Sequence, residues 1–320
     1  MIDVVAPSRR RVVSWRVWFV ALGAIWGCSF WWIKLGLRAM SPVDVAFARL
    51  VTGALTLLLL VALTRSSLPR RVRTWGHLFV VAALLNSAPF TLFSYGETHV
   101  SAVLAGLINA FTPLSTLIVV LFILRQEQVN AAIARGLALG LVGVVVLIGV
   151  WRGFGANQWW GIGACLGAVV CYGFGFAYAR RYLSSLDVSP VALASGQVTC
   201  ATLQLAPFAL ALGHVRAHPA WSSLVAIGAL GVLGTGVAYI MNFHLVRHAP
   251  ASVVSSVTYL TPVFAVIVGV SFLGESLSWN EPVGALLILA GAAIAQGRLA
   301  RLTTRRAPRE TALRVEGSDG

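Results

Sequence analysis

The sequence predicts an all-α integral membrane protein with ten transmembrane helices, arranged as two inverted five-helix repeats. Of its 320 residues, 58% are hydrophobic and only 11% are charged, whereas soluble domains carry about 25% charged residues. Apolar stretches of roughly 20 residues, the length that spans a bilayer, follow one another almost from end to end. Residues of the first half also recur in the second half at an offset of about 148.

The expected spans are separated by short connections, most of which contain proline, glycine or charged residues. In chain order they cover Trp15–Gly36, Val43–Thr64, Trp75–Tyr95, Ser101–Leu124, Ile133–Val150, Trp159–Ala179, Val191–Leu212, Leu224–Val246, Ala251–Leu273 and Pro282–Gln296. A cytoplasmic tail, 1–14, precedes the first repeat, 15–150. The second repeat, 151–299, is followed by an Arg-rich polar tail, 300–320, whose composition predicts disorder.

The basic residues indicate how the chain is oriented. With the N-terminus placed inside, 19 Lys and Arg residues fall in inner segments and 4 in outer ones. Basic residues gather on the cytoplasmic side of membrane proteins, so both termini are expected in the cytoplasm and the spans in the plasma (bacterial inner) membrane. The net charge of +14 is spread over short gaps and not over one soluble domain, so we expect no nucleic-acid partner.

Matched residues occur in the same order in both halves. The pairs are Ser41-Pro42 and Ser189-Pro190, Asn86 and Thr235, Phe90 and Tyr239, Asn109 and Thr258, Thr112-Pro113 and Thr261-Pro262, Gly136 and Gly284, and Gly143 and Gly291. Five spans is an odd number, so the second copy starts from the opposite side of the membrane. Inverted repeats of this kind suit alternating access, because each half can adopt the shape that the other has left.

A loose set of residues in and after the first, second, fourth and ninth spans has a familiar spacing. The set is Trp26-Gly27, Phe30 and Lys34; Pro42 and Ala48-Arg49; Ala102, Pro113 and Gln126-Glu127; and Ala251, Pro262 and Gly274-Glu275. Over residues 18 to 298 or so, the chain resembles the EamA family of the drug/metabolite transporter superfamily. The resemblance implies a ten-helix, two-repeat fold and the export of small metabolites, amino acids or drugs. The chain departs from the repeat at Gln197, which is the counterpart of Arg49, and at Gln126, which is the counterpart of Glu275.

Polar residues inside the spans predict a central cavity, because polar groups in lipid usually face the bundle interior. Several of them recur three or four residues apart and therefore share one helix face. With aromatic neighbours, they form the expected substrate-binding set: Trp26, Ser29, Asn86, Phe90, Asn109, Thr112, Tyr172, Tyr239, Asn242, Ser255 and Tyr259. Hydrogen bonding between packed helices is the alternative use of such residues.

Pro113 and Pro262 are expected to act as hinges, because a proline frees the carbonyl four residues before it. A static kink is the alternative. Arg49 is expected near the outer end of its span. There it either extends its side chain towards the interface or closes an outer gate by pairing with Glu97 or Asp44.

Other function classes find less support in the sequence. No Gly-rich nucleotide loop ending in Gly-Lys is present, and the ten acids are predicted at span ends, loops or tails. An importer of a sugar or other small solute, a membrane-embedded lipid-modifying enzyme and a sensor without flux are the alternatives. The sequence predicts no enzyme activity, no cofactor and no metal. It predicts a small-molecule substrate and membrane lipids as partners, and leaves a homo-oligomer open.

Overall fold

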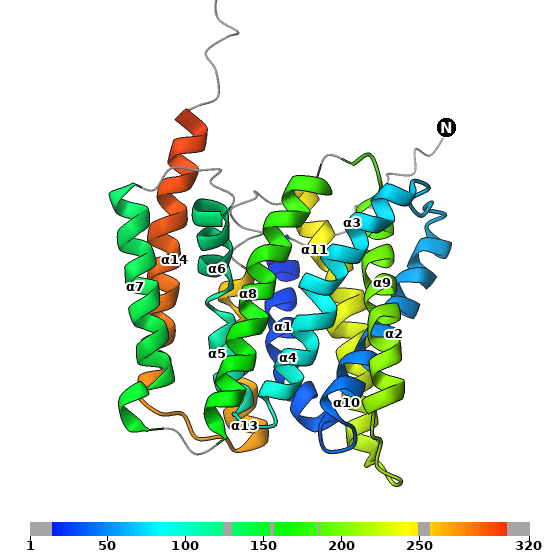
Figure 1. The fold of residues 1–320 in the computed structure, drawn as a ribbon, viewed down its shortest axis with the longest axis horizontal. Coiled ribbons are helices and arrows are strands. Elements are labelled where there is room, and N and C mark those ends of the chain that lie inside the picture. The colour runs from blue at the N-terminus through cyan, green and yellow to red at the C-terminus, as the bar shows by residue number, and fades with distance from the viewer. Residues whose placement is uncertain (1–14, 124–129, 154–156, 185, 249–256, 306–320) are drawn as a thin grey trace, which may run out of the picture.

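A computed structural model describes residues 15–123, 130–153, 157–184, 186–248 and 257–305, and these residues form a bundle of helices (Figure 1). Within them there is no β-strand, and Met40 and Val215 form an isolated antiparallel bridge. The all-α expectation is therefore confirmed for the described part of the chain.

Several helices are interrupted by turns of a different helical type. The first half contains α1 (Trp15–Gly36), α2 (Pro42–Leu63), α3 (Val72–Ala82), the π-helix η1 (Ala83–Ser87), α4 (Ala88–Gly96), α5 (Ala102–Asn109), α6 (Thr112–Ile118), the π-helix η2 (Val119–Ile123) and α7 (Ala131–Ile148). The second half contains the 3₁₀ turn η3 (Val150–Arg152), α8 (Gln158–Tyr182), α9 (Pro190–Leu212), α10 (Trp221–Gly231), the π-helix η4 (Val232–Val237), α11 (Ala238–His248), the 3₁₀ turn η5 (Val257–Tyr259), α13 (Thr261–Leu273) and α14 (Asn280–Arg305).

The repeated Ser-Pro pairs are helix starts. Ser41 accepts a hydrogen bond from the Asp44 amide at the start of α2, and Ser189 accepts one from the Ala192 amide at the start of α9. A serine cap satisfies an amide that has no partner within the helix, and proline at the first helical position has no amide to satisfy. The same local chemistry therefore begins the second helix of each repeat.

Seven helices of the described residues are long and apolar enough to cross a membrane. They are α1, α2, α3–α4, α5–α6 with η2, α7, α8 and α10–α11. The apolar helices 257–273 and 280–295 are shorter, and α9 carries Gln197 and Gln204 on its 23 residues. Large apolar side chains such as Leu210, Leu286 and Phe272 are 65% to 88% exposed, as expected of a surface whose solvent is lipid.

Exposed tryptophans gather at one end of the bundle. Trp151, Trp159, Trp160, Trp221 and Trp279 are 52% to 77% exposed and lie at or next to the ends of α7, α8, α10 and α14. These helix ends lie at the bottom of Figure 1, together with the connection from α1 to α2. Tryptophan favours the boundary between lipid and water. We call this end, which the charge pattern predicts to face outwards, the predicted outer end.

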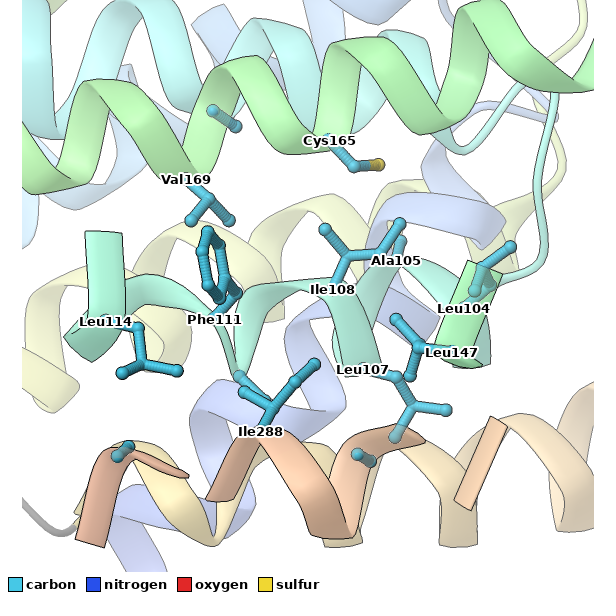
Figure 2. Close-up of a cluster of buried hydrophobic side chains, with 14 of the residues drawn as sticks. Leu104, Ala105, Leu107, Ile108, Phe111, Leu114, Leu147, Cys165, Val169 and Ile288 are labelled. Atoms are coloured by element: carbon cyan, nitrogen blue, oxygen red, sulfur yellow. The ribbon is translucent and has the colours of Figure 1, made fainter. Parts of the chain in front are cut away.

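The interrupted helix α5–α6 lies at the centre of the main apolar core. Figure 2 shows Leu107, Ile108 and Phe111 between Val169 of α8 and Ile288 of α14. Because these contacts hold α5–α6 on several sides, the break between the two helices lies inside the bundle and not at the lipid surface.

Candidate functional site

A cavity of about 210 Å³ lies between helices of both halves. Most of its wall is apolar or aromatic, with a few hydroxyl, amide and guanidinium groups. Its lining residues are Trp26, Ser29, Phe30, Ile33, Arg49, Leu85, Phe90, Phe93, Asn109, Thr112, Tyr172, Phe176, Gln197, Gly234, Tyr239, Asn242, Thr258 and Thr261.

The structure brings most of the sequence-predicted binding residues to this cavity. Those in its wall are Trp26, Ser29, Phe90, Asn109, Thr112, Tyr172, Tyr239 and Asn242. Asn86 lies behind the wall, fully buried, where its amide donates to the Tyr239 hydroxyl at 3.3 Å. Tyr259 packs against the main core outside the lining, and Ser255 lies outside the described residues. Whether these residues bind substrate stays a prediction.

Sequence reasoning missed much of the apolar wall. Ile33, Leu85 and Phe93 carried no signal in the sequence, because apolar residues in a span look alike whether they face lipid, core or cavity. Gln197 did have one, since an amide in an apolar span needs a partner inside the bundle.

Arg49 lies in the cavity wall and not at an outer ion pair. Its side chain is only 7% exposed. Nε donates to Thr235 Oγ1 at 3.0 Å, Nη2 donates to the Gly234 carbonyl at 3.3 Å, and Cζ lies 3.7 Å from the centre of the Phe90 ring. The close approach of α2 to η4 permits this, since a Cβ on Gly53 would lie 2.8 Å from Thr235.

The expected pairing of Arg49 with Glu97 or Asp44 is therefore absent from this structure. The Asp44 carboxylate accepts hydrogen bonds from Ser41 Oγ and the His214 amide. Both carboxyl oxygens of Glu97 are buried without a hydrogen-bond partner among the described residues. Burial raises the pKa of the Glu97 carboxyl, because the charged form loses its hydration.

Gln197, the counterpart of Arg49, contacts the counterparts of two of the residues that Arg49 contacts. Its amide donates to Asn86 Oδ1 at 2.6 Å and to the Tyr239 hydroxyl at 3.3 Å. Asn86 and Tyr239 are in turn the counterparts of Thr235 and Phe90, which contact Arg49. The two halves thus meet at the cavity through equivalent contacts, with a cation on one side and a neutral amide on the other.

The two predicted hinge prolines lie at the starts of helices. Helix α5 ends at Asn109 and α6 begins at Thr112, so Pro113 is the second residue of the new helix. Pro262 has the same place in α13, which follows the short turn η5. Between α5 and α6 the Thr112 hydroxyl donates to Asn109 Oδ1 at 3.1 Å. Hinge motion at Pro113 and Pro262 stays a prediction.

Two sets of contacts tie helices together at the predicted outer end. Lys34 Nζ donates to the backbone carbonyls of Glu97 at 2.6 Å and Val100 at 2.8 Å. The Glu275 carboxylate accepts from the amides of Ala102 at 2.8 Å and Val103 at 2.9 Å, in the first turn of α5. Lys34 and Glu275 therefore join α1 and the end of α13 to the connection between α4 and α5. We call these contacts the outer latch.

Residues 13–149 and 159–296 each match the EamA-like transporter family. Together the two matches cover most of the chain, one for each half. The chain belongs to the EamA-like transporter family. This membership confirms the resemblance drawn from the sequence, and it makes the chain a multi-pass membrane protein of a two-repeat transporter family.

Proteins similar to this chain are named as transporters. It is 26% identical over 263 residues to the "uncharacterized inner membrane transporter YedA" of Escherichia coli K12, covering 82% of this chain and 83% of the relative. It is 25% identical over 288 residues to the "uncharacterized transporter YdfC" of Bacillus subtilis, covering 88% and 91%. A protein of known crystal structure has the same fold, with a TM-score of 0.63, 20% identity and coverage of 89% and 97%.

Proposed function

We propose that this EamA-like protein is a secondary transporter that works by alternating access. On this proposal it exports small metabolites, amino acids or drug-like compounds across the plasma membrane and catalyses no chemical reaction. The observation that carries the proposal is a cavity between two halves that contact each other through equivalent residues. A cavity placed between repeats can be exposed to either side when the repeats move against each other.

The proposal includes ten spans and inverted repeats. Helix α9, the helical segment 257–273 and α14 would bring the seven apolar spans to ten. The repeats would cover 15–150 and 151–299. The helix order in Figure 1 supports this arrangement, because α1 begins and α14 ends at the same end of the bundle. Both termini would then be cytoplasmic, with lipid around the exposed apolar surface.

Reporter fusions test the proposed topology. A reporter joined after Gly320 is expected to be active only in its cytoplasmic form, because the proposed ten spans return the chain to the side on which it began. Activity of a periplasmic alkaline phosphatase at that position would contradict the ten-span arrangement.

Transport assays test the proposed direction. Cells that express the protein are expected to lose a loaded substrate faster than cells without it, and purified protein in vesicles is expected to support counterflow. The candidate compounds come from a metabolite panel, screened by thermal stabilisation of the purified protein. Net uptake against a gradient would favour the alternative, an importer of a sugar or other small solute.

Cavity variants test whether the binding site is correctly placed. Asn109→Ala and Tyr239→Ala are each expected to lower transport about tenfold or more, because each removes a polar group from the cavity wall. Tyr239→Ala also removes a hydroxyl that accepts from Asn86 and Gln197, so transport is compared per amount of each variant in the membrane. Thr202→Ala is a matched control, since its hydroxyl donates only to the carbonyl of Val198 in its own helix. Normal transport by both cavity variants would show that substrate binds elsewhere.

A further inference from the structure

The cavity carries one fixed charge. Among its lining residues Arg49 alone has an ionised side chain at neutral pH, and no acidic residue is in the lining. Glu97 makes no hydrogen bond to the guanidinium, because both of its carboxyl oxygens are without a hydrogen-bond partner among the described residues. Within the described part of the chain, no ion pair therefore neutralises the positive charge of the cavity.

The two hydrogen bonds of the Arg49 guanidinium use only some of its N–H groups. Of the five N–H groups that an arginine offers, one on Nε is directed at Thr235 and one on Nη2 at the Gly234 carbonyl. Both acceptors are neutral, and the Phe90 ring covers one face of the group. A buried cation without a counter-charge is costly, and an anion that supplies one is favoured in such a site.

The symmetric position shows that the contacts of Arg49 do not by themselves require a charge. Gln197 makes the equivalent contacts, to Asn86 and Tyr239, as a neutral amide. A glutamine at position 49 could bond to Thr235 in the same way. The contact between the halves therefore does not need a cation at position 49. What the cation adds is affinity for negative charge on one side of the cavity.

The rest of the cavity limits the size and shape of an occupant. Aromatic rings of Trp26, Phe93, Tyr172 and Phe176 supply flat apolar surface. The cavity volume of about 210 Å³ lies below the ~300–1,000 Å³ typical of small-molecule sites. A space of this size favours a small molecule over a lipid or a peptide.

We propose that the substrates of this protein are small amphiphilic monoanions, whose anionic group binds Arg49 and whose aromatic or apolar body packs against the rings of the cavity. This assignment rests on the proposed transport function, of which it names the substrate class. A carboxylate or a sulfonate can each accept two N–H groups from a guanidinium.

Three probes of nearly equal size and fixed charge test the assignment. They are 2-phenylethanesulfonate, which is an anion, 2-phenylethanesulfonamide, which is neutral, and (2-phenylethyl)trimethylammonium, which is a cation. Binding to the purified full-length protein is measured by calorimetry and thermal shift, and flux by counterflow in vesicles. The sulfonate is expected to bind at least about tenfold more tightly than either other probe.

Two variants at position 49 and one control separate charge from folding. Arg49→Gln is expected to weaken sulfonate binding about tenfold to hundredfold and to leave sulfonamide binding nearly unchanged. Arg49→Lys keeps the charge, and we expect it to retain a preference for the sulfonate. Arg38→Gln removes an exposed cation from the turn that follows α1, and we expect it to bind all three probes as the wild type does.

Each outcome bears on one of the two proposals. Equal binding of the three probes, or sulfonate binding that survives Arg49→Gln, overturns the anion assignment. Loss of binding in both position-49 variants with lowered melting temperatures also overturns it, since Arg49 would then act only in folding. Sulfonate that binds but shows no counterflow leaves the anion site standing and contradicts transport. Counterflow of the ammonium probe in place of the sulfonate supports transport and overturns the anion assignment.

Discussion

Glu275→Gln is expected to open the predicted outer end of the protein. Glutamine has nearly the shape of glutamate, but its single carbonyl oxygen can accept from only one of the two amides, of Ala102 and Val103, that the carboxylate binds. Hydrogen bonds to charged groups contribute about 1.5–3 kcal/mol, and the partial exposure of Glu275 lowers that value. We expect a cost of about 1–2 kcal/mol, or a roughly five- to thirtyfold change in the ratio of closed to open protein.

A cysteine at position 93 reports this opening. Phe93 lines the cavity, is 3% exposed and packs edge-to-face on Phe30. The labelling rate of Phe93→Cys by an impermeant maleimide added from outside should rise roughly five- to thirtyfold when Glu275→Gln is added. Lys34→Met should act in the same direction, because it removes the other half of the outer latch.

Glu281→Gln is the matched control for the outer latch. Glu281 lies in the first turn of α14, at the same end of the bundle, and its carboxylate accepts a hydrogen bond from the Ser278 amide, three residues earlier and just before that helix. This contact joins no separate helices, so labelling at position 93 should not change. If Glu275→Gln leaves the rate unchanged, or Glu281→Gln raises it equally, the contacts of Glu275 do not hold the outer end closed.

Gly143→Leu is expected to prevent the normal packing of α7 against α14. A Cβ at position 143 would lie 2.7 Å from the Ile288 nitrogen and 2.9 Å from the Gly284 carbonyl oxygen. These are backbone atoms, which cannot rotate away as a side chain can. Helices in lipid associate through close packing of small residues and not through a hydrophobic drive. The expected cost is at least about 3 kcal/mol, at the upper end of the cost of overpacking.

The membrane abundance and melting temperature of the purified protein measure this effect. Both should fall strongly in Gly143→Leu and to an intermediate degree in Gly143→Ala. Gly163→Leu is the control, because Gly163 is exposed on α8 and a Cβ there would meet nothing within 4 Å. A Gly143→Leu protein that is as abundant and as stable as the wild type would falsify this account of the α7–α14 contact.

Contacts between the matched glycines follow the repeat. A Cβ on Gly136 would meet the Gly291 carbonyl at 2.6 Å, just as one on Gly143 would meet that of Gly284. In the sequence alignment Gly136 corresponds to Gly284, and Gly143 corresponds to Gly291. The last helices of the two halves therefore contact each other through exchanged counterparts, and the repeat is visible in the packing as well as in the sequence.

The sequence alone determined the class of fold, most helix positions and much of the cavity. These features can be predicted because a polar side chain in an apolar span has to find a partner or water inside the bundle and not in lipid. Trp26, Asn109, Tyr172 and Tyr239 could be placed at the cavity for that reason. The Ser-Pro helix starts were equally readable, because capping is a local interaction that needs no distant partner.

The tertiary structure decided which distant groups meet. Arg49 contacts Thr235, 186 residues away, through a π-helical turn whose presence no periodicity signalled. A π-helix closes its hydrogen bonds over one residue more than an α-helix, and one residue turns an α-helix by about 100°. The turn at Ala83–Ser87 likewise brings Leu85 to the cavity and Asn86 behind it. Such a turn rotates the residues on its two sides relative to each other, and α-helical spacing alone does not show this rotation. The partner of Arg49 depends on the turn at Val232–Val237, and the partners of Glu275 depend on how the start of α5 packs beside the end of α13. Both arrangements are set only in the packed bundle.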